Sequence, residues 1–233
     1  MPWPSAADGA RRGRRVGSPE VGDAMPPVED SLRAEARGHP IFARFYDAYM
    51  LPQELWGVRR RRRWVVGNAV GVTLELGVGT GLNFPYYGRV PRLVAIDPDP
   101  TMLRQARLRA DQAPVGPALI QGMGEMLPFR TGAFDTVIST LVFASIPDPY
   151  AAAAEVRRVL KPDGRLRFFE HFRSAQPLLA GFQDAVTPLW RRLFGGCEPN
   201  RDVVRILQQA GFEMLEVVKF RRTFLLHGVA RVP

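Results

Sequence analysis

The sequence of 233 residues has little cysteine and histidine: Cys197 is the single cysteine, and the three histidines stand far apart in the chain. One cysteine excludes an intramolecular disulfide and agrees with a reducing compartment. Without a Cys and His cluster at metal-ligand spacing, we expect no metal site. No apolar run reaches the roughly 18 residues that cross a bilayer, and the first residues lack the apolar core of a signal peptide. These absences together predict a cytoplasmic protein without a metal.

Lysine is also scarce, since arginine supplies all but two of the 32 basic residues, and the formal net charge is +9. The densest basic segment is Arg59–Arg63, which is arginine throughout. Such a run can contact nucleic acid, anionic lipid head groups or an acidic partner. We favour the exposed side of a helix between Leu55 and Val66, ahead of a weak contact with an anionic membrane surface. No aromatic-rich platform accompanies the run, so we expect no nucleic-acid partner.

The chain divides into a tail and a body. Residues 1–37 are rich in proline, glycine, alanine and arginine and show little periodicity. Segments of this composition cannot bury enough apolar surface to fold, so a disordered tail is predicted. Residues 38–233 carry alternating strand and helix signals, which predict one α/β domain.

A glycine-rich turn follows the first predicted strand. Val72–Leu76 is a short apolar run that is typical of a buried parallel strand. Gly77, Gly79 and Gly81 come directly after it, and glycine lets the chain turn tightly while a ligand approaches the backbone. The helix that we predict at 80–88 would point its free N–H groups at the same turn. The pattern therefore predicts a loop that binds a nucleotide cofactor.

The spacing of this loop argues against two common nucleotide sites. Leu82 follows Gly81, so the G-x-G-x-x-G pattern of NAD-binding proteins is not met. The loop has no lysine, which a P-loop requires. Glu75, two residues before the first glycine, is unfavourable for a negative diphosphate. It favours a cofactor that carries a positive charge and an amino-acid tail.

The elements that follow alternate in type. We predict strands near 72–76, 93–97, 117–121, 134–139 and 164–171, helices near 80–88, 100–112 and 148–160, and a final strand pair at 213–220 and 223–229. Alternating βα units form a parallel sheet with helices on both faces. Ligands bind beyond the carboxyl ends of such strands, where Gly77, Asp97 and Thr140 are expected to meet.

Motifs in this order resemble those of the class I S-adenosylmethionine (SAM)-dependent methyltransferases, in particular the type 11 group. They are Glu75–Gly81, Leu93–Asp97, Gly122–Phe129, Phe134–Ser139 and Glu155–Gly164. The resemblance implies a Rossmann-like α/β fold with a seven-stranded, mostly parallel sheet, helices on both faces and an antiparallel last strand. It also implies lid helices within 38–70 and a helical insert at 174–200, before the sixth strand, that caps the substrate.

The resemblance further implies SAM as the cofactor. Asp97 would bind the ribose hydroxyls. Met123 stands where many relatives have an aspartate, so the backbone around Gly122–Glu125 is expected to contact the adenine instead. The implied cofactor-binding residues are Glu75, Gly77, Gly79, Gly81, Asn83, Asp97, Pro98, Met102, Gly122, Met123, Gly124, Glu125 and Thr140.

The methyl acceptor is expected beside the end of the fifth strand. Glu170 and His171 are the best placed acid and base there, since a neutral imidazole can take a proton from a hydroxyl or a thiol. The alternative is a structural pair that fixes the strand end. Methyl transfer itself depends mostly on the alignment of the acceptor with the activated methyl group. Further acceptor contacts are expected from Phe42, Tyr46, Phe143, Phe182, Trp190 and Cys197.

Several of these candidates have a plainer interpretation. Phe42 and Tyr46 have helical spacing and could pack a lid helix onto the body without touching a ligand. Phe182 and Trp190 belong to the apolar insert, which would wall an acceptor pocket. Cys197 precedes a predicted helix N-terminus, which can activate a thiol. Methyl transfer from SAM needs no covalent intermediate, so we favour a packed or pocket-lining cysteine.

The region after the fifth strand narrows the resemblance. Glu170-His171, the apolar insert, Gly195-Gly-Cys197 and Ala210-Gly-Phe212 succeed one another as in the branch that holds the animal alkyl-thiol methyltransferases. This branch implies methyl transfer from SAM to the thiol or hydroxyl of a small, fairly apolar acceptor. The alternatives are C-methylation of a quinone, N-methylation of a lipid amine and, from another class, a SAM-binding regulator or scaffold without catalysis. The sequence does not indicate an oligomeric state.

Overall fold

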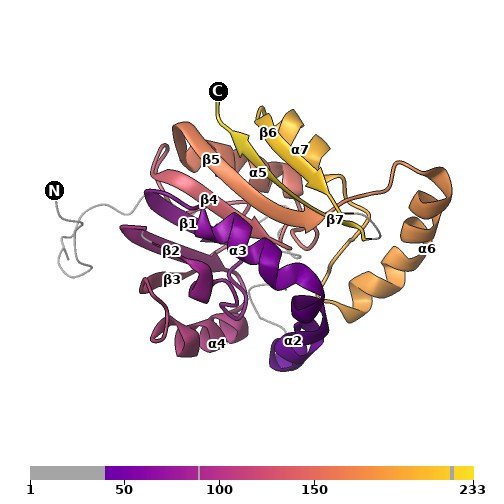
Figure 1. The fold of residues 1–233 in the computed structure, drawn as a ribbon, viewed down its shortest axis with the longest axis horizontal. Helices are drawn as coiled ribbons and strands as arrows, with labels where there is room; N and C mark the ends of the chain where they lie inside the picture. The colour runs from indigo at the N-terminus through magenta and orange to yellow at the C-terminus, as the bar shows by residue number, and fades with distance from the viewer. Residues whose placement is uncertain (1–39, 89, 221–222) are drawn as a thin grey trace, which may run out of the picture.

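The computed structural model describes residues 40–88, 90–220 and 223–233 (Figure 1). The tail predicted at 1–37 lies outside the described residues. The described chain begins with α2 (Pro40–Gln53), the π-helical turn η1 (Glu54–Val58) and α3 (Arg59–Gly67). The later helices are η2 (Phe84–Tyr86), α4 (Pro100–Ala110), α5 (Pro149–Val159), α6 (Pro177–Leu193) and α7 (Val203–Gln209). None of the helices in these ranges is long and apolar enough to cross a membrane.

A seven-stranded sheet forms the centre, in the order β3-β2-β1-β4-β5-β7-β6. Its strands are β1 (Val72–Leu76), β2 (Arg92–Asp97), β3 (Pro117–Gln121), β4 (Phe134–Thr140), β5 (Leu160–His171), β6 (Glu213–Lys219) and β7 (Leu225–Arg231). Strands β1 to β5 pair in parallel, whereas β7 pairs antiparallel with both β5 and β6. The predicted mostly parallel sheet with an antiparallel last strand is confirmed.

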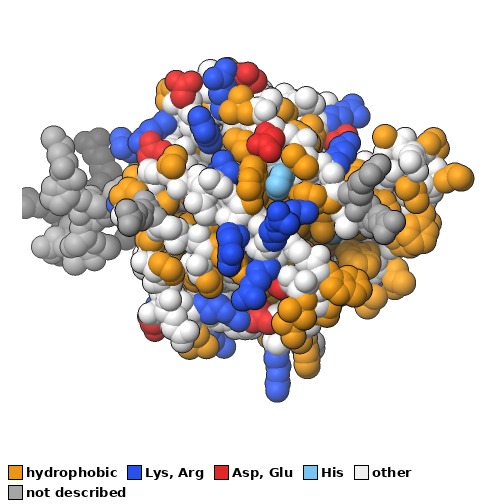
Figure 2. Space-filling model, in the orientation of Figure 1, with side chains coloured by type: hydrophobic (Ala, Val, Ile, Leu, Met, Phe, Trp, Pro, Cys, Tyr) orange, Lys and Arg blue, Asp and Glu red, His pale blue; other side chains and the backbone are white. Residues whose placement is uncertain are grey.

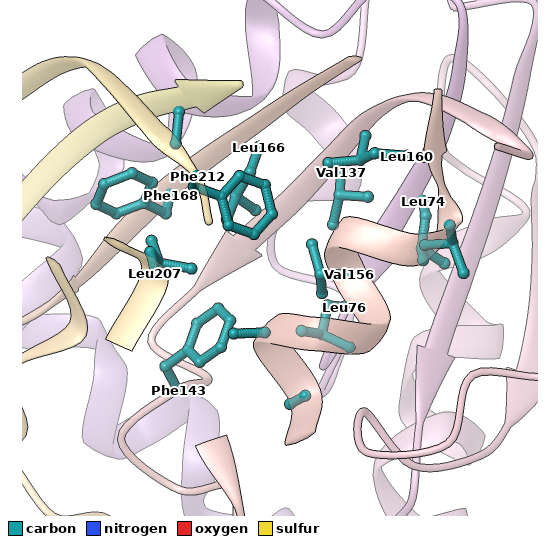
Figure 3. Packing of buried hydrophobic residues seen from close by; sticks show 14 of the residues in the cluster. Leu74, Leu76, Val137, Phe143, Val156, Leu160, Leu166, Phe168, Leu207 and Phe212 are labelled. Atoms are coloured by element: carbon teal, nitrogen blue, oxygen red, sulfur yellow. The ribbon is translucent and has the colours of Figure 1, made fainter. Parts of the chain in front are cut away.

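Each face of the sheet has its own apolar core, which the covering helices complete. On one face, Val156 of α5 and Leu207 of α7 belong to the same buried cluster as Phe168 of β5 (Figure 3). On the other face, Val65 of α3 and Ala106 of α4 belong to a second cluster. Burial of a Val, Leu or Phe side chain stabilises the fold by about 1.5–3 kcal/mol. The two cores hold the carboxyl ends of the parallel strands at one edge of the sheet.

The segment after the glycine turn is not the helix predicted at 80–88. Only the short 3-10 helix η2 forms there. Gly81 has a φ of 83°, which a right-handed helix does not allow, and Gly88 and Pro91 disfavour helix just before β2. The turn therefore offers its own backbone, and not a helix N-terminus, to a ligand.

The arginine run of α3 is not uniformly exposed, contrary to our expectation. Arg62 is only 3% exposed, because the period of the helix puts it on the same side as the buried Val58 and Val66. Arg61 lies over the ring of Phe220, with its guanidinium carbon 3.9 Å from the ring centroid. The other members of the run are exposed. One arginine of the run is thus available for an internal role.

The insert predicted at 174–200 contains α6, which extends away from the sheet and lies beside α2 (Figure 1). Tyr49 of α2 packs against Phe194 after α6, with ring centroids 4.7 Å apart. The two helices therefore share a boundary on one side of the molecule. The role of α6 as a substrate cap stays a prediction.

Candidate functional site

A cavity lies at the carboxyl ends of β1, β2 and β4, with residues of α2 in its wall. Parallel strand ends meet at one edge of a sheet, so turns far apart in the sequence share this wall. The wall contains most of the predicted cofactor residues and two of the predicted acceptor residues. They are Gly77, Gly79, Asp97, Pro98, Met102, Gly122, Gly124, Glu125 and Thr140 from the first set, and Phe42 and Tyr46 from the second.

Two glycines of the turn after β1 have different structural roles. Gly77 and Gly79 both have a positive φ, of 61° and 55°. A Cβ at Gly77 would lie 2.6 Å from the Val142 side chain, so this glycine permits close packing. A Cβ at Gly79 would meet nothing within 4 Å. Gly79 therefore leaves its backbone open toward the cavity, as a ligand that lies against the turn would require.

Asp97 at the end of β2 anchors this turn. Its Oδ2 accepts a hydrogen bond from the Gly79 N–H at 2.7 Å, and its Oδ1 accepts one from the Asp99 N–H at 2.9 Å. Burial raises the pKa of the Asp97 carboxyl to about 6. A carboxylate can accept about four hydrogen bonds, so Asp97 retains acceptor capacity for a ligand in the cavity.

A buried polar network supports the wall from behind. The Asn83 Nδ2 donates to Glu75 Oε1 at 2.8 Å and to Thr140 Oγ1 at 2.8 Å. Burial raises the pKa of Glu75 to about 7, although the hydrogen bond from Asn83 opposes this. Glu75 and Asn83 do not line the cavity, and neither do Gly81 and Met123. Direct contact of these residues with the cofactor stays a prediction, and among the described residues Asn83 joins Glu75 to Thr140.

Arg62 completes the network and is a residue that the sequence analysis missed. Its Nη1 donates to Asn83 Oδ1 at 3.0 Å and to Thr140 Oγ1 at 3.1 Å, and its Nε donates to Glu54 Oε1 at 2.7 Å. Its buried Nη2 has no hydrogen-bond partner among the described residues. Arg62 interacts electrostatically with Tyr46, which lines the cavity. Arg62 lies four residues from the apolar Val58 and Val66, and this helical spacing is the sequence signal that could have identified it as buried.

A second set of contacts fastens α2 over the glycine turn. The Thr80 hydroxyl donates to Asp47 Oδ1 at 2.7 Å, and Arg109 Nη1 donates to the Thr80 carbonyl at 2.6 Å. Arg109 of α4 also forms an ion pair with Asp47. These contacts hold the part of α2 that carries Phe42 and Tyr46. The sequence pattern could not reveal them, because they join three segments that are distant in the chain.

Glu170 does not line the cavity, and its predicted position beside the acceptor stays a prediction. Its side chain is 0% exposed. It accepts hydrogen bonds from Ser139 Oγ at 2.7 Å, from the Val142 N–H at 3.0 Å and from the Phe143 N–H at 3.3 Å. Burial raises the pKa of Glu170 to about 7. The carboxyl group therefore fixes the turn after β4, in agreement with the structural alternative.

His171 is also absent from the cavity wall. Neighbouring residues of a strand point to opposite faces, so His171 points away from Glu170. Burial lowers the pKa of His171 to about 4, while a hydrogen bond to the Phe224 backbone opposes this. Its Nδ1 is buried without a hydrogen-bond partner in the described ranges. These observations favour the structural alternative, and the role of His171 as a base beside the acceptor stays a prediction.

The other predicted acceptor residues lie off the wall as well. Phe143 is fully buried in the core (Figure 3), and Phe182 is exposed on α6. Trp190 packs against Phe194, with ring centroids 4.3 Å apart. Burial raises the pKa of the Cys197 thiol to about 11. Cys197 therefore stays protonated at neutral pH, which supports a packed cysteine and not a nucleophile.

A second cavity, of about 530 Å³, lies between α2 and the end of α6. It shares Phe42 and Gly195 with the first cavity. A Cβ at Gly195 would lie 2.9 Å from the Phe42 ring, so these residues are in close contact. The contact between Phe42 and Gly195 therefore separates the two cavities.

The open glycine turn after β1, the carboxylate at the end of β2 and the cavity at these strand ends define a Rossmann-like site for a nucleoside cofactor. Comparison with known proteins agrees with this class. The family described as "Methyltransferase domain" matches residues 74–168. Thiol S-methyltransferase TMT1B of Homo sapiens is 32% identical over 153 residues, which cover 62% of this chain and 61% of that protein. Phosphatidylethanolamine N-methyltransferase of Cereibacter sphaeroides is 32% identical over 160 residues, which cover 68% of this chain and 78% of that protein.

Solved structures show the same fold. An S-adenosylmethionine dependent methyltransferase from Mesorhizobium loti superposes with a TM-score of 0.57 at 17% identity, covering 73% of this chain and 95% of that one. The chain belongs to the class I SAM-dependent methyltransferase family. It spans about three-fifths of the length of the human thiol methyltransferase, at 61%.

Proposed function

We propose that this protein transfers the methyl group of SAM to a small, fairly apolar acceptor, and that a thiol is its preferred nucleophile. The observation that carries the proposal is the composition of the cavity wall. An open glycine backbone and Asp97 suit the cofactor, and Phe42 and Tyr46 of α2 suit an apolar acceptor. The relationship to a human thiol S-methyltransferase supports the choice of acceptor.

The residues of the wall fit SAM. The free space at Gly79 would let the cofactor lie against the backbone. Asp97 would accept hydrogen bonds from the ribose hydroxyls, and Met102 would contribute an apolar surface for the adenine. Arg62, behind Thr140, would add a positive charge that attracts the carboxylate of the amino-acid tail. When bound, SAM supplies a methyl group that its sulfonium already activates.

The choice of a thiol over a hydroxyl rests on the ionisable groups of the wall. No histidine lines the cavity within the described ranges. The carboxylates of Asp97, Asp99 and Glu125 all accept hydrogen bonds from backbone N–H groups. These bonds occupy part of the acceptor capacity of each carboxylate, so we expect the wall to give the acceptor little help in losing its proton. A thiol, with an ordinary pKa of about 8.5, ionises far more readily than an alcohol.

Calorimetric titration of one purified sample with SAM and with NAD tests the cofactor. We expect binding of SAM alone. Binding of NAD would contradict the proposal, because the loop lacks the spacing that a diphosphate requires. Binding of neither ligand would favour the alternative of a scaffold with a degenerate site.

A panel of matched acceptors tests the reaction. An alkyl thiol, the corresponding alcohol, a phenol and a quinol are each incubated with methyl-labelled SAM. We expect the thiol to accept the label fastest, with a rate that rises with pH as the thiol ionises. SAM binding without transfer to any acceptor would favour a SAM-binding regulator.

N-methylation of a lipid amine is the second candidate. The similarity to the phosphatidylethanolamine N-methyltransferase extends over 78% of that protein, whereas the similarity to the human thiol S-methyltransferase extends over 61%. The exposed Leu178 and Phe182 of α6 also agree with a lipid substrate. Methyl label in phosphatidylethanolamine vesicles, with none in the alkyl thiol, would replace the first proposal by this one. A cytoplasmic location stays part of either proposal and is supported by the single Cys197.

A further inference from the structure

The helix α6 exposes its apolar side to solvent. Leu178, Phe182, Leu189 and Leu193 follow one another at spacings of four or seven residues, and they are 90%, 60%, 64% and 61% exposed. Such spacing places them along one face of the helix. The side that faces the body carries the buried Ala180, Gln183 and Thr187. The amphipathic pattern is thus the reverse of that expected for a helix that completes a core.

This orientation is held by specific polar contacts. The Gln183 amide accepts a hydrogen bond from the Ser174 N–H at 2.8 Å and donates to the carbonyls of Phe172 at 3.0 Å and Pro199 at 3.2 Å. Asp184 pairs with Arg173 at 2.7 Å. Turning the apolar face inward would bury Leu and Phe side chains but break all of these bonds. The exposed apolar face is therefore a built feature of the fold.

The apolar surface continues onto the N-terminal helices. Phe45 of α2 is 60% exposed and lines the second cavity together with Leu193 of α6. Leu55 and Trp56 of η1 are also exposed. Figure 2 shows hydrophobic side chains gathered over α6 and Lys and Arg side chains gathered over α3 on the same face of the molecule. An apolar surface of this extent, spread over two segments, is typical of an interaction site.

Arginines border this surface. Arg191 and Arg192 in the last turn of α6 line the second cavity, and both are exposed. The exposed members of the arginine run lie on α3, and the whole chain carries a net charge of +9. Apolar side chains next to arginines complement a bilayer with anionic head groups, which takes up both. A symmetric contact with a second copy would instead bring the same arginines of both copies together.

We propose that the face formed by α6 and α2 docks onto anionic membrane surfaces, with Leu178, Phe182 and Leu193 inserted among the lipids. Arg191 and Arg192 contact the head groups. The second cavity, whose rim includes Phe45 and Leu193, then opens at the lipid surface. An apolar acceptor dissolved in the bilayer can enter this cavity and reach Phe42 without crossing water. Docking does not depend on which acceptor is methylated.

Vesicle flotation of the full chain tests the docking. We expect binding to vesicles of phosphatidylcholine with phosphatidylglycerol, weaker binding to phosphatidylcholine alone, and a decrease as salt is raised. The double variant Leu178→Glu/Phe182→Glu should bind at least about tenfold more weakly, since two apolar anchors become charged. The matched control is Leu108→Glu on α4, at a leucine that is 70% exposed but lies outside this face.

A second pair of variants isolates the charge. Arg191→Gln/Arg192→Gln should weaken binding to the anionic vesicles by about tenfold, because each basic residue near such a surface contributes electrostatic attraction to the head groups. Arg104→Gln/Arg107→Gln, at two exposed arginines of α4, is the control and should bind as the parent does. Equal losses in test and control variants would overturn the proposal. Absence of vesicle binding would also overturn it. In that case, a dimer in sedimentation equilibrium that Leu178→Glu/Phe182→Glu dissociates would assign the face to a second copy of the chain.

Discussion

The carboxyl ends of β2 and β5 each carry a buried acidic residue, yet the two residues serve different surfaces. Asp97 lies on the cavity wall and accepts a hydrogen bond from Gly79. Glu170 is 0% exposed and, within the described part of the chain, accepts hydrogen bonds from β4 and the turn after it. Burial raises the pKa of both, to about 6 and about 7. A raised pKa at a strand end therefore does not identify a catalytic acid, whereas the direction of the side chain does.

The largest effect is expected for Glu170→Ala. Ser139 and the backbone N–H groups of Val142 and Phe143 would lose their acceptor, and each unsatisfied buried donor costs about 1–3 kcal/mol. The free energy of unfolding should fall by about 3 kcal/mol or more, measured by urea denaturation. Glu170→Gln retains an acceptor oxygen and should lose less. Normal stability with a slow methyl transfer would restore the catalytic interpretation.

Asp97→Ala should act mainly on binding, with a smaller loss of stability from the Gly79 and Asp99 N–H groups that it leaves without an acceptor. The variant removes the carboxylate expected to hold the ribose, and charge-assisted hydrogen bonds of this kind make a loss of about 100-fold in SAM affinity reasonable. Calorimetric titration measures the loss. Asp111→Ala, at an exposed acid after α4, is the matched control and should bind SAM as the parent does. Micromolar affinity in Asp97→Ala would remove the ribose assignment.

Arg62→Gln sharpens the comparison, since this residue supports the wall from behind. It should lower SAM affinity by about 30-fold, because the positive charge behind Thr140 that would attract the cofactor carboxylate is lost. Arg60→Gln, two residues earlier and exposed, should leave affinity unchanged. If methionine-free analogues such as adenosine lose as much affinity as SAM does, Arg62 acts through the network with Asn83 and not on the amino-acid tail.

The pH dependence of SAM binding separates the two carboxylates further. Because the pKa of Asp97 is raised to about 6, this group gains a proton as the pH falls through that value. Its capacity as a charged acceptor decreases below pH 6, so affinity should drop by up to about tenfold between pH 7 and 5. Asp97→Asn should bind weakly with a flat profile. A profile that persists in Asp97→Asn but vanishes in Glu170→Gln would transfer the effect to Glu170.

The difference between Asp97 and Glu170 also shows which features could be predicted from the sequence. The sheet, the glycine turn and Asp97 follow from local patterns: apolar runs, glycines and the residue that ends a strand. The direction of Glu170 depends on which face of β5 meets the turn after β4, which no local pattern specifies. Arg62 was hidden because a run of like charges suggests solvent exposure, although its helical phase places it inside. The contacts of Asp47 with Thr80 and Arg109 depend on tertiary packing alone.

His171→Ala is expected to have the smallest effect, and it tests whether the acceptor side needs a base at all. The imidazole is off the cavity wall, and burial lowers its pKa to about 4, so it is neutral and distant from the acceptor in this conformation. With an alkyl thiol, the rate of methyl transfer by His171→Ala should stay within about twofold of the parent's rate at each pH from 6 to 8, because the thiol ionises without the imidazole. Tyr46→Phe, on the wall, is the informative comparison. A loss in His171→Ala that grows with the pKa of the acceptor would mean that α2 opens to a second conformation in which His171 reaches the substrate.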